Sequence, residues 1–135
     1  MQALLILCLA FDLAAIKLEP NLERRSERAL DNASAAMDTA RDDAAAGDLA
    51  KVKADLDELR DSVDLAYQSL VDSGKSARRN PKFFKKAELK TRELMRRLEG
   101  LAQAVDADDR PAVETVRERV SKVHDDLIHD IMQKK

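Results

Sequence analysis

Aromatic residues, chain breakers and cysteine are all scarce in this sequence. Among 135 residues there is no tryptophan, aromatic residues make up 3%, and glycine and proline each occur three times. So few aromatic and turn-forming residues argue against a β-sheet fold. So little glycine also excludes the glycine-rich loops that hold phosphates or a catalytic nucleophile. The single cysteine, Cys8, excludes an internal disulfide and any metal site built from several cysteines. No apolar run approaches the roughly 20 residues that a membrane-spanning helix needs.

Charged and helix-forming residues are abundant instead. Asp, Glu, Lys and Arg make up 37% of the chain, and alanine and leucine are frequent, which is typical of long amphipathic helices. The length suits one domain with a buried core. The net charge of −2 hides a strong asymmetry. Residues 31–72 carry eleven acids against four basic residues, whereas residues 75–97 carry ten basic residues against two acids.

The clearest predicted helix runs from Asp48 to Gly74. Its apolar residues recur at alternating steps of three and four, which places them along one seam of a helix: Leu49, Val52, Leu56, Leu59, Val63, Ala66 and Leu70. Two later stretches repeat this spacing: Phe84, Ala87, Thr91, Leu94, Leu98, Leu101 and Val105, then Val113, Val116, Val120, Val123, Leu127 and Ile131. The stretch from residue 20 to 46 has a weaker stripe of small residues: Leu22, Ser26, Ala29, Leu30, Ala33, Ala36, Met37, Ala40 and Ala44.

Start and stop signals separate these four stretches. Pro20-Asn21, Gly47-Asp48, Gly74, Asn80-Pro81 and Asp109 with Pro111 all stand where a helix should end or begin. Helices of matched length joined by short turns predict an all-α fold, an antiparallel up-down-up-down four-helix bundle over residues 20–135. Residues 1–19 form a separate short apolar N-terminal segment. The alternative architecture is a longer helical hairpin that forms the same bundle as a homodimer.

The N-terminal segment has features of a truncated signal peptide. Its apolar run, residues 3–11, ends near Cys8-Leu9-Ala10, a small-x-small pattern typical of a cleavage site. A positively charged leader is missing. We therefore expect an exported protein, periplasmic or extracellular. The alternative is a cytoplasmic protein whose N-terminal segment packs on the bundle.

The two histidines are the only candidates for a cofactor or metal site. Asp126 and His129 have the spacing of a ligand pair in di-iron bundles, and His124 lies beside the last seam, as the haem ligand does in b-type cytochrome bundles. Neither histidine has the further ligands that such sites need. Since no catalytic motif is present either, we expect a non-enzymatic protein without cofactor or metal, acting by binding or structure. A small-ligand bundle that holds haem or metal through His124 or His129 is the alternative.

The basic segment from Lys75 to Arg97 is the strongest functional candidate. Seven of its cations lie on the predicted helix and form a candidate anion-binding face: Lys82, Lys85, Lys86, Lys90, Arg92, Arg96 and Arg97. An anionic polymer or lipid head groups would fit such a face, whereas nucleic acid is not the expected partner of an exported protein. The alternative is that these cations only neutralise the acidic side of the preceding helix, at Asp57, Asp61 and Asp64.

Several phrases of the sequence resemble an uncharacterised family of small exported bacterial helical proteins. The phrases are Glu19 to Ser26, Asn80 to Glu88, Asp109 to Val113 and Val123 to Leu127. The family has no assigned activity. The resemblance therefore implies export and a helical fold, and it assigns no catalytic residue.

Overall fold

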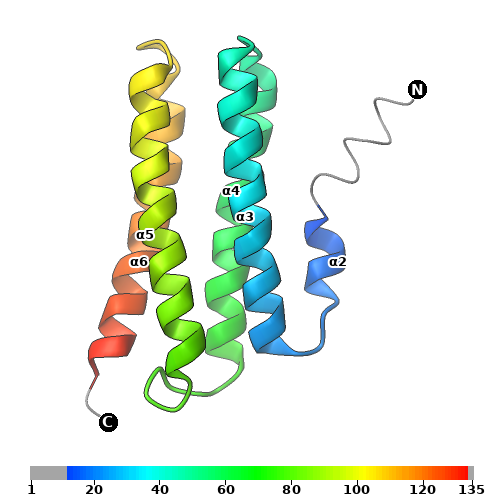
Figure 1. The fold of residues 1–135 in the computed structure, drawn as a ribbon, viewed down its shortest axis with the longest axis vertical. Coiled ribbons are helices and arrows are strands. Elements are labelled where there is room, and N and C mark those ends of the chain that lie inside the picture. Colours follow the sequence, from blue (N-terminus) through cyan, green and yellow to red (C-terminus); the bar gives the residue numbers. More distant parts are fainter. Residues whose placement is uncertain (1–11, 134–135) are drawn as a thin grey trace.

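Four long helices and one short one make up the part of the chain that the structure describes. The computed structural model describes residues 12–133, and within this range it contains no strand. The helices are α2 (Leu13–Lys17), α3 (Leu22–Ala45), α4 (Leu49–Asp72), α5 (Pro81–Ala104) and α6 (Arg110–Met132). The prediction of an all-α helical bundle is confirmed (Figure 1).

The helix boundaries follow from the residues that mark them in the sequence. Asn21 and Asp48 each accept a hydrogen bond from a backbone N–H in the first turn of their helix. Gly47 and Gly74 adopt φ angles of +78° and +71°, a conformation that glycine adopts without the steric cost of a Cβ atom. Asn80 stands at the start of α5, but its side chain makes no capping hydrogen bond. It donates instead to Glu23 of α3, with an Nδ2–Oε1 distance of 3.4 Å.

The predicted seams form one hydrophobic core. Leu59, Val63, Leu98 and Val120 are completely buried, and burying a side chain of this size contributes roughly 1.5–3 kcal/mol. The prediction is wrong at Leu49, which is 41% exposed. Leu49 is the first residue of α4 and follows the end of α3 at Ala45, so it lies at the end of the seam, where it is less completely enclosed.

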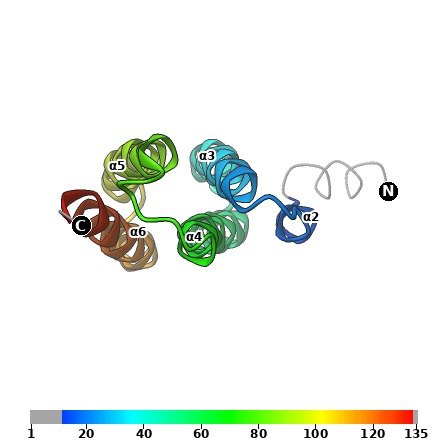
Figure 2. The ribbon, with the colours of Figure 1, turned by 90° about the horizontal axis from the view of Figure 1, so that it is seen from below.

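The four long helices are arranged as two antiparallel hairpins, α3–α4 and α5–α6 (Figure 1). In the view along the bundle, α3 lies beside α5 and α4 lies beside α6, and the connection from α4 to α5 crosses between the hairpins (Figure 2). Chain direction alternates along the sequence, so each of these side-by-side pairs is parallel. This order decides which charged side chains meet.

The α3–α4 hairpin carries a polar row beside its apolar seam. Asn32 of α3 is buried and donates from Nδ2 to the Oε2 atom of Glu58 at 2.7 Å and to the Oγ atom of Ser62 at 2.9 Å, both on α4. Ser62 and Ser69 are buried as well. Because buried polar groups are costly without partners, these contacts fix the register of the two helices.

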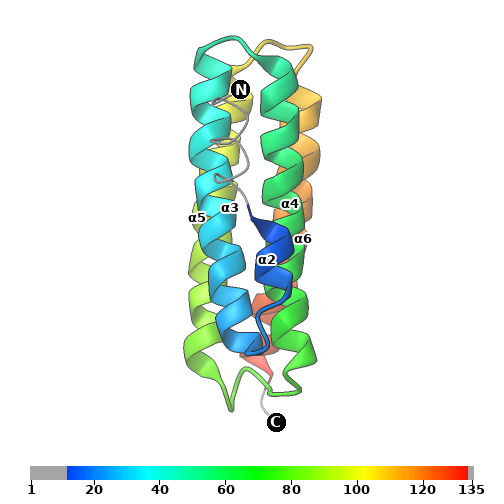
Figure 3. The ribbon, with the colours of Figure 1, turned by 90° about the vertical axis from the view of Figure 1, so that its right-hand side faces the viewer.

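Helix α2 packs on the outer side of α3 and α4 (Figure 3). Asp12 accepts a hydrogen bond from the backbone N–H of Ala15, and Ile16 is 6% exposed and belongs to the core. The later part of the predicted N-terminal segment, residues 12–19, therefore packs on the bundle. The predicted cleavage site at Cys8-Leu9-Ala10 lies outside the described residues.

Candidate anion-binding face on α5

The seven predicted cations all lie on α5, but the structure divides them into two sets. Lys86, Lys90 and Arg97 are only partly exposed, and Lys86 and Arg97 reach α3. The other four are exposed and form the set that we call the basic stripe: Lys82, Lys85, Arg92 and Arg96. The two sets have different electrostatic surroundings.

Two of the three partly exposed cations, Lys86 and Arg97, form ion pairs with α3. Lys86 Nζ lies 2.5 Å from Glu27 Oε2, and Arg97 pairs with Asp38. The hydrogen bond to Glu27 raises the pKa of Lys86, although partial burial opposes this. Lys86 and Arg97 are therefore each paired with an acid of the same protein.

Their partners are not the acids that the sequence analysis proposed. We expected the acidic side of residues 48–74 to meet the basic helix, but Asp57 and Asp61 both contact Arg60 of their own helix. Asp64 binds Arg119 of α6, with an Nε–Oδ1 distance of 2.8 Å. That part of the prediction is wrong because α5 packs beside α3 rather than beside α4.

The basic stripe follows one side of α5. Its members are separated by three, seven and four residues, and these intervals bring side chains to the same side of a helix. From Lys82 to Arg96 the stripe extends over about 21 Å at the usual rise per residue. Leu89 lies between the two halves of the stripe and is 56% exposed. Lys82 Nζ lies 5.4 Å from the centre of the Phe83 ring, a distance at which a cation is attracted to an aromatic face.

One member of the stripe, Arg92, neutralises a buried carboxylate. It donates to Glu88 through Nε at 2.9 Å and through Nη2 at 2.5 Å. His124 of α6 contacts the same carboxylate, with an Nε2–Oε2 distance of 2.8 Å. Burial alone would raise the pKa of Glu88, but the hydrogen bonds from His124 and Arg92 outweigh burial and lower it. The Glu88–His124 contact therefore joins α5 to α6 through a carboxylate that stays charged.

The structure does not bring the two histidines together. His124 is engaged with Glu88, whereas His129 is 72% exposed and lies 3.8 Å from Asp130. Among residues 12–133, no three His, Cys, Asp or Glu side chains converge closely enough to hold a metal ion. The described residues therefore offer no set of metal ligands that would support the alternative of a haem or metal bundle.

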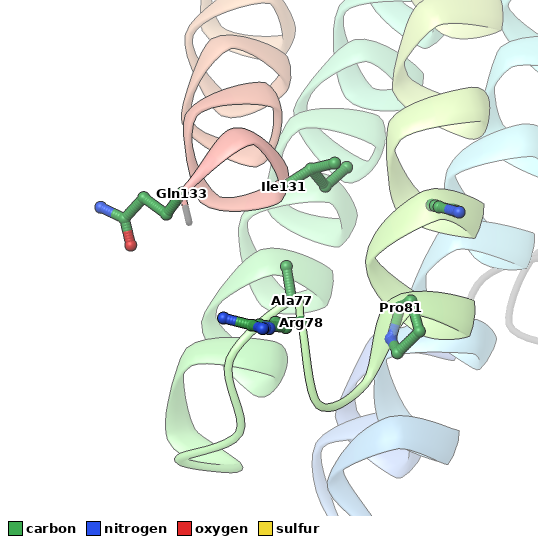
Figure 4. Close-up of a pocket in the computed structure, with 6 residues that line it drawn as sticks. Ala77, Arg78, Pro81, Ile131 and Gln133 are labelled. Atoms are coloured by element: carbon green, nitrogen blue, oxygen red, sulfur yellow. The ribbon is translucent and has the colours of Figure 1, made fainter. Parts of the chain in front are cut away.

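A hollow lies at the Lys82 end of the stripe, where the α4–α5 connection meets the end of α6 (Figure 4). Its volume is about 470 Å³, and its lining consists of Ala77, Arg78, Pro81, Lys85, Ile131 and Gln133. Two of these side chains are cationic, so the hollow extends the positive surface of the stripe onto the loop before α5. Lys75, in the same loop, is paired with Glu23 of α3 at 2.7 Å.

Sequence reasoning did not find two buried carboxyl groups, Glu88 and Asp55, which are 8% and 4% exposed. A signal for Asp55 exists in the sequence, since Asp55, Ser62 and Ser69 are spaced by seven residues beside the apolar seam. Such a spacing keeps all three on one side of the helix. Glu88 has the corresponding position next to Ala87 and Thr91 on α5.

Comparison of the chain with protein families, with curated proteins and with solved structures gave no match. Within the described part of the chain, no helix combines the length and the hydropathy required to cross a membrane.

Proposed function

We propose that this protein is a non-enzymatic binding protein whose basic stripe on α5 holds an extended anionic polymer. The observation that supports this most is the incomplete pairing of the stripe. Lys82, Lys85 and Arg96 are exposed, and among residues 12–133 none of them forms an ion pair. Arg92 adds a fourth positive group whose side chain is 61% exposed beside Glu88.

The shape of the stripe favours a polymer over a small anion. The cations are spread along a straight helix, so a chain of regularly spaced anionic groups contacts several of them at once. Glu93 is the acid that lies among them, and it leaves a positive excess on this side of α5. Each additional contact raises the local concentration of the polymer at the next one.

An exported protein would meet acidic polysaccharides, which are polymers of this kind. We include export in the proposal because cleavage after Ala10 would leave α2 complete, together with Asp12, the N-cap residue that precedes it. Measuring the mass of the mature protein and its distribution between cell fractions tests export separately from binding.

Retention on a heparin matrix tests the binding proposal. The wild-type protein should be retained at low ionic strength and released as salt is raised, since exposed charge interactions are screened. Lys85→Glu should elute earlier because one attractive contact becomes repulsive. Lys53→Glu is the matched control, since Lys53 is an exposed lysine on α4 without an ion pair in the described structure. Equal elution of the two variants, or a wild-type protein that is not retained, would exclude the stripe as the binding surface.

The exposed Leu89 supports a second candidate, an anionic lipid surface. An apolar side chain among cations inserts between lipid head groups while the cations contact the phosphates. Leu89→Ser should then reduce binding to vesicles that contain anionic lipid, while leaving retention on heparin unchanged. Absence of wild-type binding to such vesicles would exclude this candidate and leave the polymer.

A further inference from the structure

A second hollow lies far from the start of the stripe, between the C-terminal halves of α3 and α5. Its volume is about 370 Å³, within the range of roughly 300–1,000 Å³ that is typical of small-molecule sites. The lining is mainly apolar and consists of Met37, Ala44, Ala45, Gly100, Leu101 and Ala104, with Arg41 and Arg97 among them. We refer to this feature as the α3–α5 groove.

The groove exists because both helices present small side chains at this level. Met37 is buried at its base, but Ala44 and Ala45 of α3 and Ala104 of α5 are too short to fill the space between the helices. Elsewhere the α5 seam is filled by larger residues such as Leu94 and Leu98. The end of the bundle with the α3–α4 and α5–α6 turns is therefore less completely packed.

No other part of the described protein occupies the space beside Gly100. It lies inside α5, where its φ angle is negative, and a Cβ atom built on it would meet nothing within 4 Å. Glycine lowers the stability of a helix interior relative to alanine. Neither a turn nor a close contact of the described residues explains it, whereas a molecule seated in the groove would.

The positive charges at the edge of the groove favour a ligand that has an anionic group. Arg41 is exposed and has no ion-pair partner within the described part of the chain. Arg97 uses one nitrogen for Asp38, which leaves other N–H groups of its guanidinium available. An apolar groove edged by two guanidinium groups is complementary to an alkyl chain that ends in an anionic group.

We propose that the α3–α5 groove binds a single free fatty acid, with its alkyl chain against the alanines and Gly100 and its carboxylate at Arg41 and Arg97. The groove runs from Met37 to Ala45 on α3, about 12 Å of helix, which suits a chain of medium length. This site is separate from the proposed polymer-binding function, and neither depends on the other.

Calorimetric titration with dodecanoate, below its micellar concentration, tests the proposal. The wild-type protein should bind one dodecanoate per chain. Gly100→Leu fills the groove, and because leucine favours helix, the variant should be at least as helical as the wild type. It should bind dodecanoate about tenfold more weakly or worse, since the alkyl chain loses its apolar contacts. Gln103→Leu adds the same side chain to α5 outside the groove and should bind like the wild type.

Two further measurements separate the parts of the proposal. Arg41→Gln should weaken dodecanoate binding roughly threefold, the effect of an exposed ion pair, and should leave binding of the uncharged dodecanol unchanged. Lys85→Glu should not affect dodecanoate binding. The fatty-acid proposal and the polymer-binding proposal can therefore fail independently of each other. Non-saturating binding, or equal affinities of Gly100→Leu and Gln103→Leu, would overturn the proposal. So would a wild-type dimer that Gly100→Leu dissociates, because the groove would then be covered by a second copy of the chain.

Discussion

Replacing Asp55 with asparagine should stabilise the protein at neutral and alkaline pH. Asp55 lies on α4 and is 4% exposed, and its Oδ2 atom is buried without a hydrogen-bond partner among the described residues. Burial raises the pKa of Asp55, and Asp43 of α3 raises it further through a hydrogen bond and its charge, to about 8. Asp48 adds to the rise and Lys51 opposes it. Asp55 therefore stays protonated beside Asp43, near the α3–α4 turn.

The direction of the pH dependence follows from this proton. The ordinary pKa is 3.8, and the folded protein holds the proton up to about pH 8, whereas the unfolded chain loses it above its ordinary value. The free energy of unfolding should therefore fall as pH rises between about 4 and 8, by at most about 1.4 kcal/mol per pH unit from this group. Asparagine keeps the hydrogen bond to Asp43 without a titrating proton. At pH 8 it should raise the free energy of unfolding by about 2–5 kcal/mol.

Urea unfolding, followed by circular dichroism at several pH values from 5 to 9, measures this directly. Asp55→Asn should gain stability relative to the wild type as pH rises. Asp57→Asn is the control, because Asp57 is exposed on the same helix and should show a small effect that does not grow with pH. If Asp55→Asn is less stable than the wild type at pH 8, or if the difference is independent of pH, the buried acid pair does not exist as described.

Three further substitutions test the packing and the charges. Leu59→Asp should unfold the bundle, because a buried unpaired carboxylate costs several kcal/mol, comparable with the stability of a domain. A variant whose thermal unfolding temperature lies within a few degrees of the wild type would place Leu59 outside the core. Lys86→Glu should lower stability by about 1 kcal/mol by opposing Glu27, and high salt should reduce the loss, so a loss that is unaffected by salt contradicts the ion pair. Glu88→Gln should cost about 1–3 kcal/mol by leaving its histidine and arginine partners without a charged acceptor. Since the pKa of Glu88 in the folded protein is lowered from its ordinary value of 4.5, that cost should be present at neutral pH and lost as pH falls through the lowered pKa, and chemical denaturation at neutral and at acidic pH measures it.

The elements of the fold were predictable because each helix carries its own signals. The three-four spacing of the seams and the turns at Gly47 and Gly74 depend on local sequence, and the structure agrees with them. The neighbours of each helix were not predictable in this way. The connection from Asp72 to Pro81 allows α5 to pack beside either α3 or α4, and the seam of α5 is apolar toward both.

The candidate site was predictable only as a group of cations. The spacing placed seven of them on one helix, but their pairing depends on the helix that packs alongside. Because α3 is the neighbour of α5, Lys86 pairs with Glu27 and Arg97 pairs with Asp38. The members of the basic stripe remain exposed to solvent. The Glu88–His124 contact likewise joins residues 36 positions apart, which no local pattern predicts.

The most direct test of the polymer-binding function is nuclear magnetic resonance of the backbone amides during titration with a short heparin oligosaccharide. We predict saturable shifts that are largest at Lys82, Lys85, Leu89, Arg92 and Arg96, and that weaken together as salt is raised. Shifts centred on another helix, or no saturable shifts at low ionic strength, would contradict it.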